Sequence, residues 1–133
     1  MKRAGQLGTL LAIGLIVAAV FPWREFQSHS HWAKVRWIPF SPPLGFRDIA
    51  VNVALFMPLG AAIAFQVAAP LMIRRAVLAA AALSLVAECT QIFSHSRFPS
   101  ATDVAANVFG AMIGASIVRF WRQAPHLESE LER

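Results

Sequence analysis

The chain has little charge, no tyrosine and a single cysteine. Charged residues make up 14% of its 133 residues, whereas hydrophobic residues make up 57%. That ratio excludes an ordinary small soluble domain, in which about 25% of residues are charged, and is typical of a polytopic membrane protein. The lone Cys89 has no partner for an internal disulfide, and its place in an apolar segment indicates a small hydrophobic residue.

Sequence motifs for common cofactors and for nucleic acid are also missing. There is no Gly-rich phosphate loop, no nucleophile elbow and no paired-cysteine metal motif. His29 and His31 lack a third ligand nearby, so a solvated loop is the better interpretation. The net charge of +5 comes from basic residues in the connections between apolar segments, not from one basic face. We therefore expect no cofactor, no metal and no nucleic-acid partner.

Four apolar segments are each long enough to cross about 30 Å of hydrocarbon as a helix. They cover residues 5–21, 49–69, 76–93 and 104–121. The first also fits a signal peptide, but no clean small-x-small cleavage site precedes Pro22, so we interpret it as an uncleaved helix. The predicted fold is all-α, a polytopic membrane four-helix bundle over residues 1–122. Residues 123–133 form a polar C-terminal tail, either a solvated helix or disordered.

The connections between these segments predict the topology. Residues 22–48 form a loop whose prolines exclude a continuous helix and whose aromatic residues suit a membrane–water interface. The basic residues on the side of the chain ends are Lys2, Arg3, Arg74, Arg75, Arg119, Arg122 and Arg133. Those on the opposite side are Arg24, Lys34, Arg36, Arg47 and Arg97. By the positive-inside rule, we expect both termini in the cytoplasm.

Small residues predict close helix packing. Ala106, Gly110 and Gly114 recur at four-residue spacing in the fourth segment, so they share a helical face along which another helix can approach closely in lipid. The alanine run 79–82 has the same effect in the third segment. Pro58 removes one backbone hydrogen bond in the second segment and predicts a kink there.

Three short polar pairs interrupt the apolar segments. They are Asp48 with Asn52, Glu88 with Gln91, and Asp103 with Asn107. The second and fourth segments begin, and the third ends, on one side of the membrane, so all three pairs are expected near the same face. Within each pair the spacing of three or four residues places both side chains on one side of a helix. A weak repeat accompanies them, because residues 48–53 resemble residues 103–108.

Glu88 is expected to be the deepest of these acids, about 7–8 Å from the end of its helix. An isolated charge at membrane depth costs about 2.5–3.5 kcal/mol, so Glu88 should be paired with Arg97 or Arg47, or else protonated. Asp48 and Asp103 also fit helix caps. Asn52 and Asn107 also fit interhelical hydrogen bonding. No cap needs Glu88, and a functional role is favoured for it.

Three stretches resemble the VanZ-like family of bacterial membrane proteins. They are Ile38-Pro39-Phe40, the run from Asp48 through Asn52 and Pro58 to Gly60, and Glu88-x-x-Gln91 followed by Arg97, Asp103, Asn107 and Gly110. The namesake of this family is associated with reduced susceptibility to the glycopeptide teicoplanin. The resemblance therefore implies a bacterial inner membrane, a cell-envelope role and a link to antibiotic resistance. Arg36 stands where the family often has Asn, which changes the charge of the site if that position contributes to it.

Two main hypotheses follow. In the first, the protein binds or processes a membrane lipid or a lipid-linked envelope molecule at the extracytoplasmic side. The predicted catalytic residues are Glu88, Asp103 and Arg97, and the predicted substrate-binding residues are Asp48, Asn52, Gln91 and Asn107. Glu88 would act as general acid or base and Arg97 would hold an anionic headgroup. In the second, the polar cluster is structural and the protein is a non-catalytic membrane module or accessory subunit. A small transporter subunit is a third possibility, and the sequence identifies no protein partner.

Overall fold

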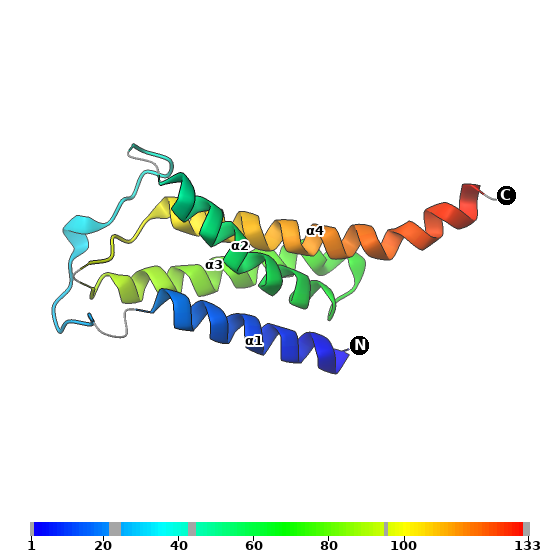
Figure 1. The fold of residues 1–133 in the computed structure, drawn as a ribbon, viewed down its shortest axis with the longest axis horizontal. Helices are drawn as coiled ribbons and strands as arrows, with labels where there is room; N and C mark the ends of the chain where they lie inside the picture. Colours follow the sequence, from blue (N-terminus) through cyan, green and yellow to red (C-terminus); the bar gives the residue numbers. More distant parts are fainter. Residues whose placement is uncertain (1, 22–24, 43–44, 95, 132–133) are drawn as a thin grey trace.

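The computed structural model describes residues 2–21, 25–42, 45–94 and 96–131, and within them the chain forms four α-helices that lie side by side (Figure 1). The helices are α1 (Lys2–Val20), α2 (Phe46–Ala64), α3 (Met72–Gln91) and α4 (Ala101–Leu131). All four are long and apolar enough to cross a membrane. Large apolar side chains such as Leu10, Leu78 and Phe109 are exposed on their outer faces, as expected of helices that contact lipid. The predicted all-α membrane bundle is confirmed.

The described chain begins and ends at the same end of the bundle, and two longer connections lie at the other end (Figure 1). Residues 25–42 precede α2 and contain only one short helical turn, η1 (Trp32–Lys34). Residues 92–100 join α3 to α4. We call this end of the bundle the loop end. The opposite connection is short and includes the turn η2 (Ala69–Leu71).

Several helix bounds differ from those predicted. α2 begins at Phe46 rather than at residue 49, because Gly45 serves as its N-cap and its carbonyl accepts the N–H of Ile49 at 3.0 Å. It ends at Ala64 rather than at residue 69. α3 begins at Met72 rather than at residue 76, so Arg74 and Arg75 lie in its first turns and not in the connection. Both arginines are exposed there, since long basic side chains can extend from a helix end toward water.

α4 continues as a helix to Leu131, well beyond its predicted end at residue 121. The tail is therefore helical as far as the structure describes it, which was one of the two alternatives. Residues 132–133 lie outside the described residues. So do Arg24 and Pro22, which the topology prediction also used.

The closest packing in the bundle joins α2 to α4 through glycine. A Cβ atom on Gly110 or Gly114 would collide with the backbone of Val53 or Met57 in α2, and one on Gly60 would collide with the backbone of Ala111. The two helices therefore touch backbone to backbone, as the small-residue spacing in α4 predicts. This contact fixes the start of α4 beside the start of α2, where two of the polar pairs lie.

The remaining helices pack around this central pair. Ala12 and Ile16 of α1, Phe56 and Leu59 of α2 and Ala80 of α3 are buried in one apolar cluster with Ala111 of α4. The buried Ala80 belongs to the predicted alanine run. Pro58 lies inside α2, and its kink stays a prediction. This apolar cluster joins all four helices and so fixes the positions of their ends at the loop end relative to one another.

Candidate polar site at the loop end of the bundle

The loop before α2 is tied to the α3–α4 connection by backbone hydrogen bonds. The N–H groups of Gln27 and His31 donate to the carbonyls of Phe93 and Ile92, both at 2.8 Å. Farther along, the N–H of Arg36 donates to Pro99 at 2.8 Å, and the carbonyl of Arg36 accepts the N–H of Ala101 at 3.0 Å. These bonds place Arg36 directly beside the start of α4.

The segment Ile38-Pro39-Phe40 docks the same loop onto α4. The N–H of Phe40 donates to the hydroxyl of Thr102 at 2.8 Å. Phe40 has a φ of 58°, in the left-handed region that costs a non-glycine residue about 1–2 kcal/mol. The hydrogen bond to Thr102 helps to hold this conformation. The segment therefore positions the loop over the first turn of α4.

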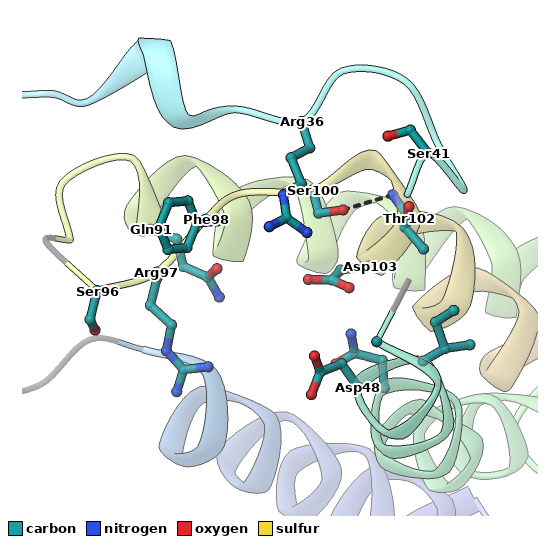
Figure 2. Close-up of a pocket in the computed structure, with 13 residues that line it drawn as sticks. Arg36, Ser41, Asp48, Gln91, Ser96, Arg97, Phe98, Ser100, Thr102 and Asp103 are labelled. Carbon is teal, nitrogen blue, oxygen red and sulfur yellow. Dashed lines mark hydrogen bonds between the residues drawn. The ribbon is translucent and has the colours of Figure 1, made fainter. Parts of the chain in front are cut away.

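Asp48 and Asp103 occupy the same position, the third residue, in α2 and α4. Ser100 caps α4 without help from Asp103: its carbonyl accepts the N–H groups of Asp103 and Val104 at 3.1 and 3.3 Å, and its hydroxyl accepts that of Thr102 at 3.2 Å. Both acids still benefit from the positive end of the helix dipole. Their carboxylates face the same space (Figure 2).

That space is a polar cavity of about 280 Å³. It is lined by Arg36, Ser41, Gly45, Asp48, Ile49, Asn52, Gln91, Ser96, Arg97, Phe98, Ser100, Thr102 and Asp103. Five of the seven predicted site residues are therefore brought together here: Asp48, Asn52, Gln91, Arg97 and Asp103. Sequence reasoning gave Arg36 no role, although its position was noted as a difference from the family. Its place in the lining shows that this position contributes a positive charge to the cavity.

The four charged side chains lie around the cavity, and in the part of the chain that the structure describes they do not pair directly with one another. Asp48, Arg36 and Arg97 lie close enough to Asp103 to act on its carboxyl group electrostatically, and the amide of Asn52 interacts with it as well. Figure 2 shows Arg36 reaching toward the space from the loop and Arg97 lying on the far side of it from Asp48. Within the described part of the chain, no nitrogen–oxygen contact of 4.0 Å or less joins any two of the four.

Gln91 links the cavity to α1. Its side chain is buried and its amide donates to the carbonyl of Val20, at the end of α1, at 3.4 Å. This bond is long, and a weak one by geometry. Gln91 therefore both lines the cavity and draws α1 toward it.

Glu88 lies outside the lining of the polar cavity. Its side chain is 8% exposed, and its Oε2 accepts the N–H of Ser100 at 2.7 Å. Of the two expected alternatives, the ion pair with Arg97 or Arg47 is not formed among the described residues, and protonation of Glu88 stays a prediction. Arg97 acts on Glu88 only at longer range. The observed hydrogen bond holds the N-cap of α4, and through it the position of Asp103.

Glu88 borders a second, mostly apolar cavity of about 250 Å³. Its apolar lining includes Trp32, Trp37, Leu85 and Val104. Arg36 and Ser100 line both cavities, so the short stretch where the two loops pair forms the wall between them. A charged cavity and an apolar cavity are thus adjacent at the loop end.

Asn107 also lies outside the polar cavity. Its amide nitrogen donates to the hydroxyl of Ser84 at 2.8 Å, and both side chains are buried. Its Oδ1 has no hydrogen-bond partner among the described residues. This geometry fits interhelical hydrogen bonding between α3 and α4. Ser84 was missed from the sequence, although its spacing of four residues from Glu88 places it on the same face of α3.

In the part of the loop end that the structure describes, potential metal ligands do not form a metal-binding group. The rings of His29 and His31 lie edge to face with centroids 4.6 Å apart. No group of three or more histidine, cysteine or acidic side chains with metal-binding geometry occurs among the described residues. The cavity offers two guanidinium groups for an anion, two carboxylates for a cation, and amides and hydroxyls for hydrogen bonds.

Comparison with known proteins gives the family. The VanZ/LLP1 family model matches residues 7–122, a range that includes every residue lining the two cavities at the loop end. No curated protein and no solved structure matches the chain. The matched range covers most of the 133 residues; it begins within the first membrane-spanning helix and ends within the fourth. The chain is therefore a multi-pass membrane protein that belongs to the VanZ/LLP1 family.

Proposed function

We propose that this protein binds an amphipathic molecule of the bacterial cell envelope, a membrane lipid or a lipid-linked compound, with its headgroup in the polar cavity. One observation carries the proposal: Arg36, Arg97, Asp48 and Asp103 line one cavity, and no direct ion pair joins them in the described part of the chain. The cavity lies where the membrane-spanning helices begin and end. Arg36, Asp48 and Arg97 are exposed and Asp103 is half-buried, so these charges are accessible to the headgroup of a ligand that enters the cavity.

The adjoining apolar cavity supports an amphipathic ligand rather than a soluble one. Its lining of tryptophan and aliphatic side chains suits an acyl or prenyl chain, and it is separated from the polar cavity only by the wall at Arg36 and Ser100. The chain of a ligand whose headgroup is held in the polar cavity would have to pass around the edge of this wall to pack in the apolar cavity. The hydrophobic part of the ligand would remain continuous with the surrounding lipid.

Within this proposal the residues have distinct roles. Arg97 and Arg36 hold the anionic part of the headgroup, because guanidinium groups bind phosphate and carboxylate in a bidentate manner. Asp48 and Asp103, with Asn52 and Gln91, orient it. Glu88 and Asn107 are positioning residues, since each bonds to another part of the protein and neither lines the polar cavity. Acid–base catalysis by Glu88 is the alternative, and no reaction is assigned.

The proposal includes an orientation: a bacterial inner membrane, both termini in the cytoplasm and the loop end outside. Ser96 is exposed at the loop end and Cys89 is the single cysteine, so Ser96→Cys in a Cys89→Ala background provides a unique label. A membrane-impermeant thiol reagent is expected to label this variant in intact cells. Labelling that requires permeabilised cells would overturn the orientation.

Co-purifying amphiphiles test the binding proposal. Wild type, Arg97→Gln and Arg47→Gln are purified in the same mild detergent and their bound lipids are measured by native mass spectrometry. Arg47 is the matched control, because it is exposed in the first turn of α2 but does not line the cavity. Loss of one charge-assisted contact is expected to weaken retention about tenfold or more in Arg97→Gln only. Equal retention by all three proteins would contradict the proposal.

The same proposal covers glycopeptide susceptibility. If the bound molecule is part of the envelope that teicoplanin encounters, expression of the wild type is expected to change the minimum inhibitory concentration of teicoplanin, and Arg97→Gln expressed at the same level is expected to cancel the change. A change that persists in Arg97→Gln would separate resistance from the cavity.

A structural module is the second candidate function. The hydrogen bonds from Ser100 to Glu88 and from Asn107 to Ser84 both tie α3 to α4 or to its N-cap. If the whole polar cluster serves only this purpose, substitutions of Arg97 and Asp103 would lower stability and leave lipid retention unchanged. Measuring unfolding as well as lipid retention on purified Arg97→Gln and Asp103→Asn distinguishes the two.

A further inference from the structure

The charges that line the polar cavity are balanced. Two guanidinium groups, from Arg36 and Arg97, face two carboxylates, from Asp48 and Asp103, and the remaining described lining residues are neutral. A site built for a simple anion would carry an excess of positive charge, as phosphate sites with clustered arginines do. Balanced charge instead favours a ligand that itself carries both signs.

The carboxylates leave a place for a cation. Asp48 and Asp103 project from the first turns of two helices that touch through glycine, so the α2–α4 contact forces like charges close together. Asp103 interacts electrostatically with Asp48, and neither acid is neutralised by a direct ion pair among the described residues. A positive group between the two carboxylates would relieve this repulsion.

The aromatic content of the cavity selects the kind of cation. Quaternary ammonium groups are bound by cages of several aromatic rings. Phe98 is the only aromatic residue in the described lining, and its ring already lies near Lys34 and Arg36, with 5.5 and 5.7 Å from the charged groups to its centroid. Carboxylates, by contrast, accept hydrogen bonds from the N–H groups of a primary ammonium.

We propose that the ligand of the polar cavity is a zwitterionic amphiphile with a phosphate and a primary ammonium, of the phosphoethanolamine type. Arg36 and Arg97 bind the phosphate, and Asp48 and Asp103 bind the ammonium. A cavity of about 280 Å³ has room for such a group, since a water molecule takes up about 30 Å³ of liquid. This inference rests on the proposed function, because it names the headgroup for the same site.

A headgroup series tests the inference. The purified protein is titrated by native mass spectrometry with amphiphiles that share the same acyl chains and differ only in the headgroup: phosphoethanolamine, phosphocholine and phosphoglycerol. Wild type is expected to bind the phosphoethanolamine amphiphile about tenfold more tightly than the other two. Asp48→Asn combined with Asp103→Asn is expected to remove this preference while leaving phosphoglycerol binding no weaker, because only the ammonium contacts are lost.

The control variants separate failure of the inference from failure of the proposed function. Arg97→Gln should weaken binding of all three amphiphiles, and Arg47→Gln should change none. Equal binding of the three headgroups that still depends on Arg97 would overturn the zwitterion assignment and leave the proposed function standing. Binding that is insensitive to Arg97 would overturn both. Soluble glycerophosphoethanolamine is expected to compete poorly, and competition equal to that of the amphiphile would exclude a membrane-borne ligand.

Discussion

Replacing Glu88 by alanine is expected to destabilise the protein by about 1–3 kcal/mol. Glu88 Oε2 accepts the N–H of Ser100 at 2.7 Å, and both residues are 8% exposed. Removing the acceptor leaves a buried N–H without a partner, which accounts for the whole of that range. Glu88→Gln keeps a carbonyl oxygen of the same reach, so its cost should fall below about 1.5 kcal/mol, the net value of a neutral hydrogen bond.

Unfolding in mixed detergent micelles, followed by circular dichroism, measures these free energies of unfolding. Glu25→Ala is the control, since Glu25 is an exposed acid at the same end of the bundle. Its carboxylate accepts a hydrogen bond from the hydroxyl of Ser96, but that bond is exposed to water, so its loss should cost no more than about 0.5 kcal/mol. The order of stability should therefore be wild type and Glu25→Ala, then Glu88→Gln, then Glu88→Ala. A Glu88→Ala variant as stable as wild type would refute the positioning role.

Lipid retention on the same samples separates positioning from acid–base chemistry. If Glu88 positions the N-cap of α4, Glu88→Gln should retain the amphiphile within a few-fold of wild type, because Asp103 remains in place. If Glu88 transfers a proton, Glu88→Gln should fold and bind the amphiphile, yet lose the effect of the wild type on the minimum inhibitory concentration of teicoplanin. Normal folding with lost phenotype would therefore favour catalysis by Glu88 over a positioning role.

Three further substitutions test the packing and the cavity. Gly114→Ala should cost about 1–3 kcal/mol of unfolding free energy, because the added Cβ meets the backbone of α2. Gly14→Ala is the control: its Cβ would have nothing within 4 Å, so the change should be neutral or stabilising by up to about 1 kcal/mol. Equal effects of the two substitutions would contradict the backbone contact. Gly45→Ala should displace the carboxylate of Asp48, which its Cβ would strike, and weaken amphiphile binding with little loss of stability; unchanged binding would remove Asp48 from the site. Arg122→Ala should lower stability by about 1–3 kcal/mol, because Arg122 donates at 3.2 and 2.9 Å to two carbonyls that follow α2; no change in unfolding would show that water replaces it.

Much of the fold follows directly from the sequence. Apolar length predicts four membrane-spanning helices, since a helix of about 20 residues crosses the hydrocarbon and satisfies its own backbone groups in lipid. Parity then places the ends of the helices that carry Asp48, Glu88 and Asp103 together. The four-residue spacing of small residues predicts the close approach of α4 to another helix. These inferences need only local periodicity and the order of the segments.

Two features of the site do not follow from the sequence. The rotation of α3 about its own axis turns Glu88 toward Ser100 and the apolar cavity, although Gln91, three residues later, lines the polar one. The loop before α2 is joined to the α3–α4 connection by hydrogen bonds between residues far apart in the chain, which bring Arg36 to the cavity. Periodicity shows which residues share a face, but it does not show which neighbour that face meets.

The equivalent positions of Asp48 and Asp103 show the same limit. Both are third in their helices and both face the cavity, so the repeat in the sequence matches a repeat in local structure. One helical turn later the match ends: Asn52 lines the cavity, whereas Asn107 bonds to Ser84. At that depth Asn52 faces the cavity and Asn107 faces α3. The sequence of either helix alone does not show which neighbour its polar face meets.

A structure determined in a lipid bilayer that contains a phosphoethanolamine lipid tests the proposed binding site most directly. We predict a headgroup in the polar cavity, with its phosphate on Arg36 and Arg97 and its chain leaving past the wall at Ser100. An empty cavity in which the arginines have closed onto Asp48 and Asp103 as ion pairs would contradict the proposal.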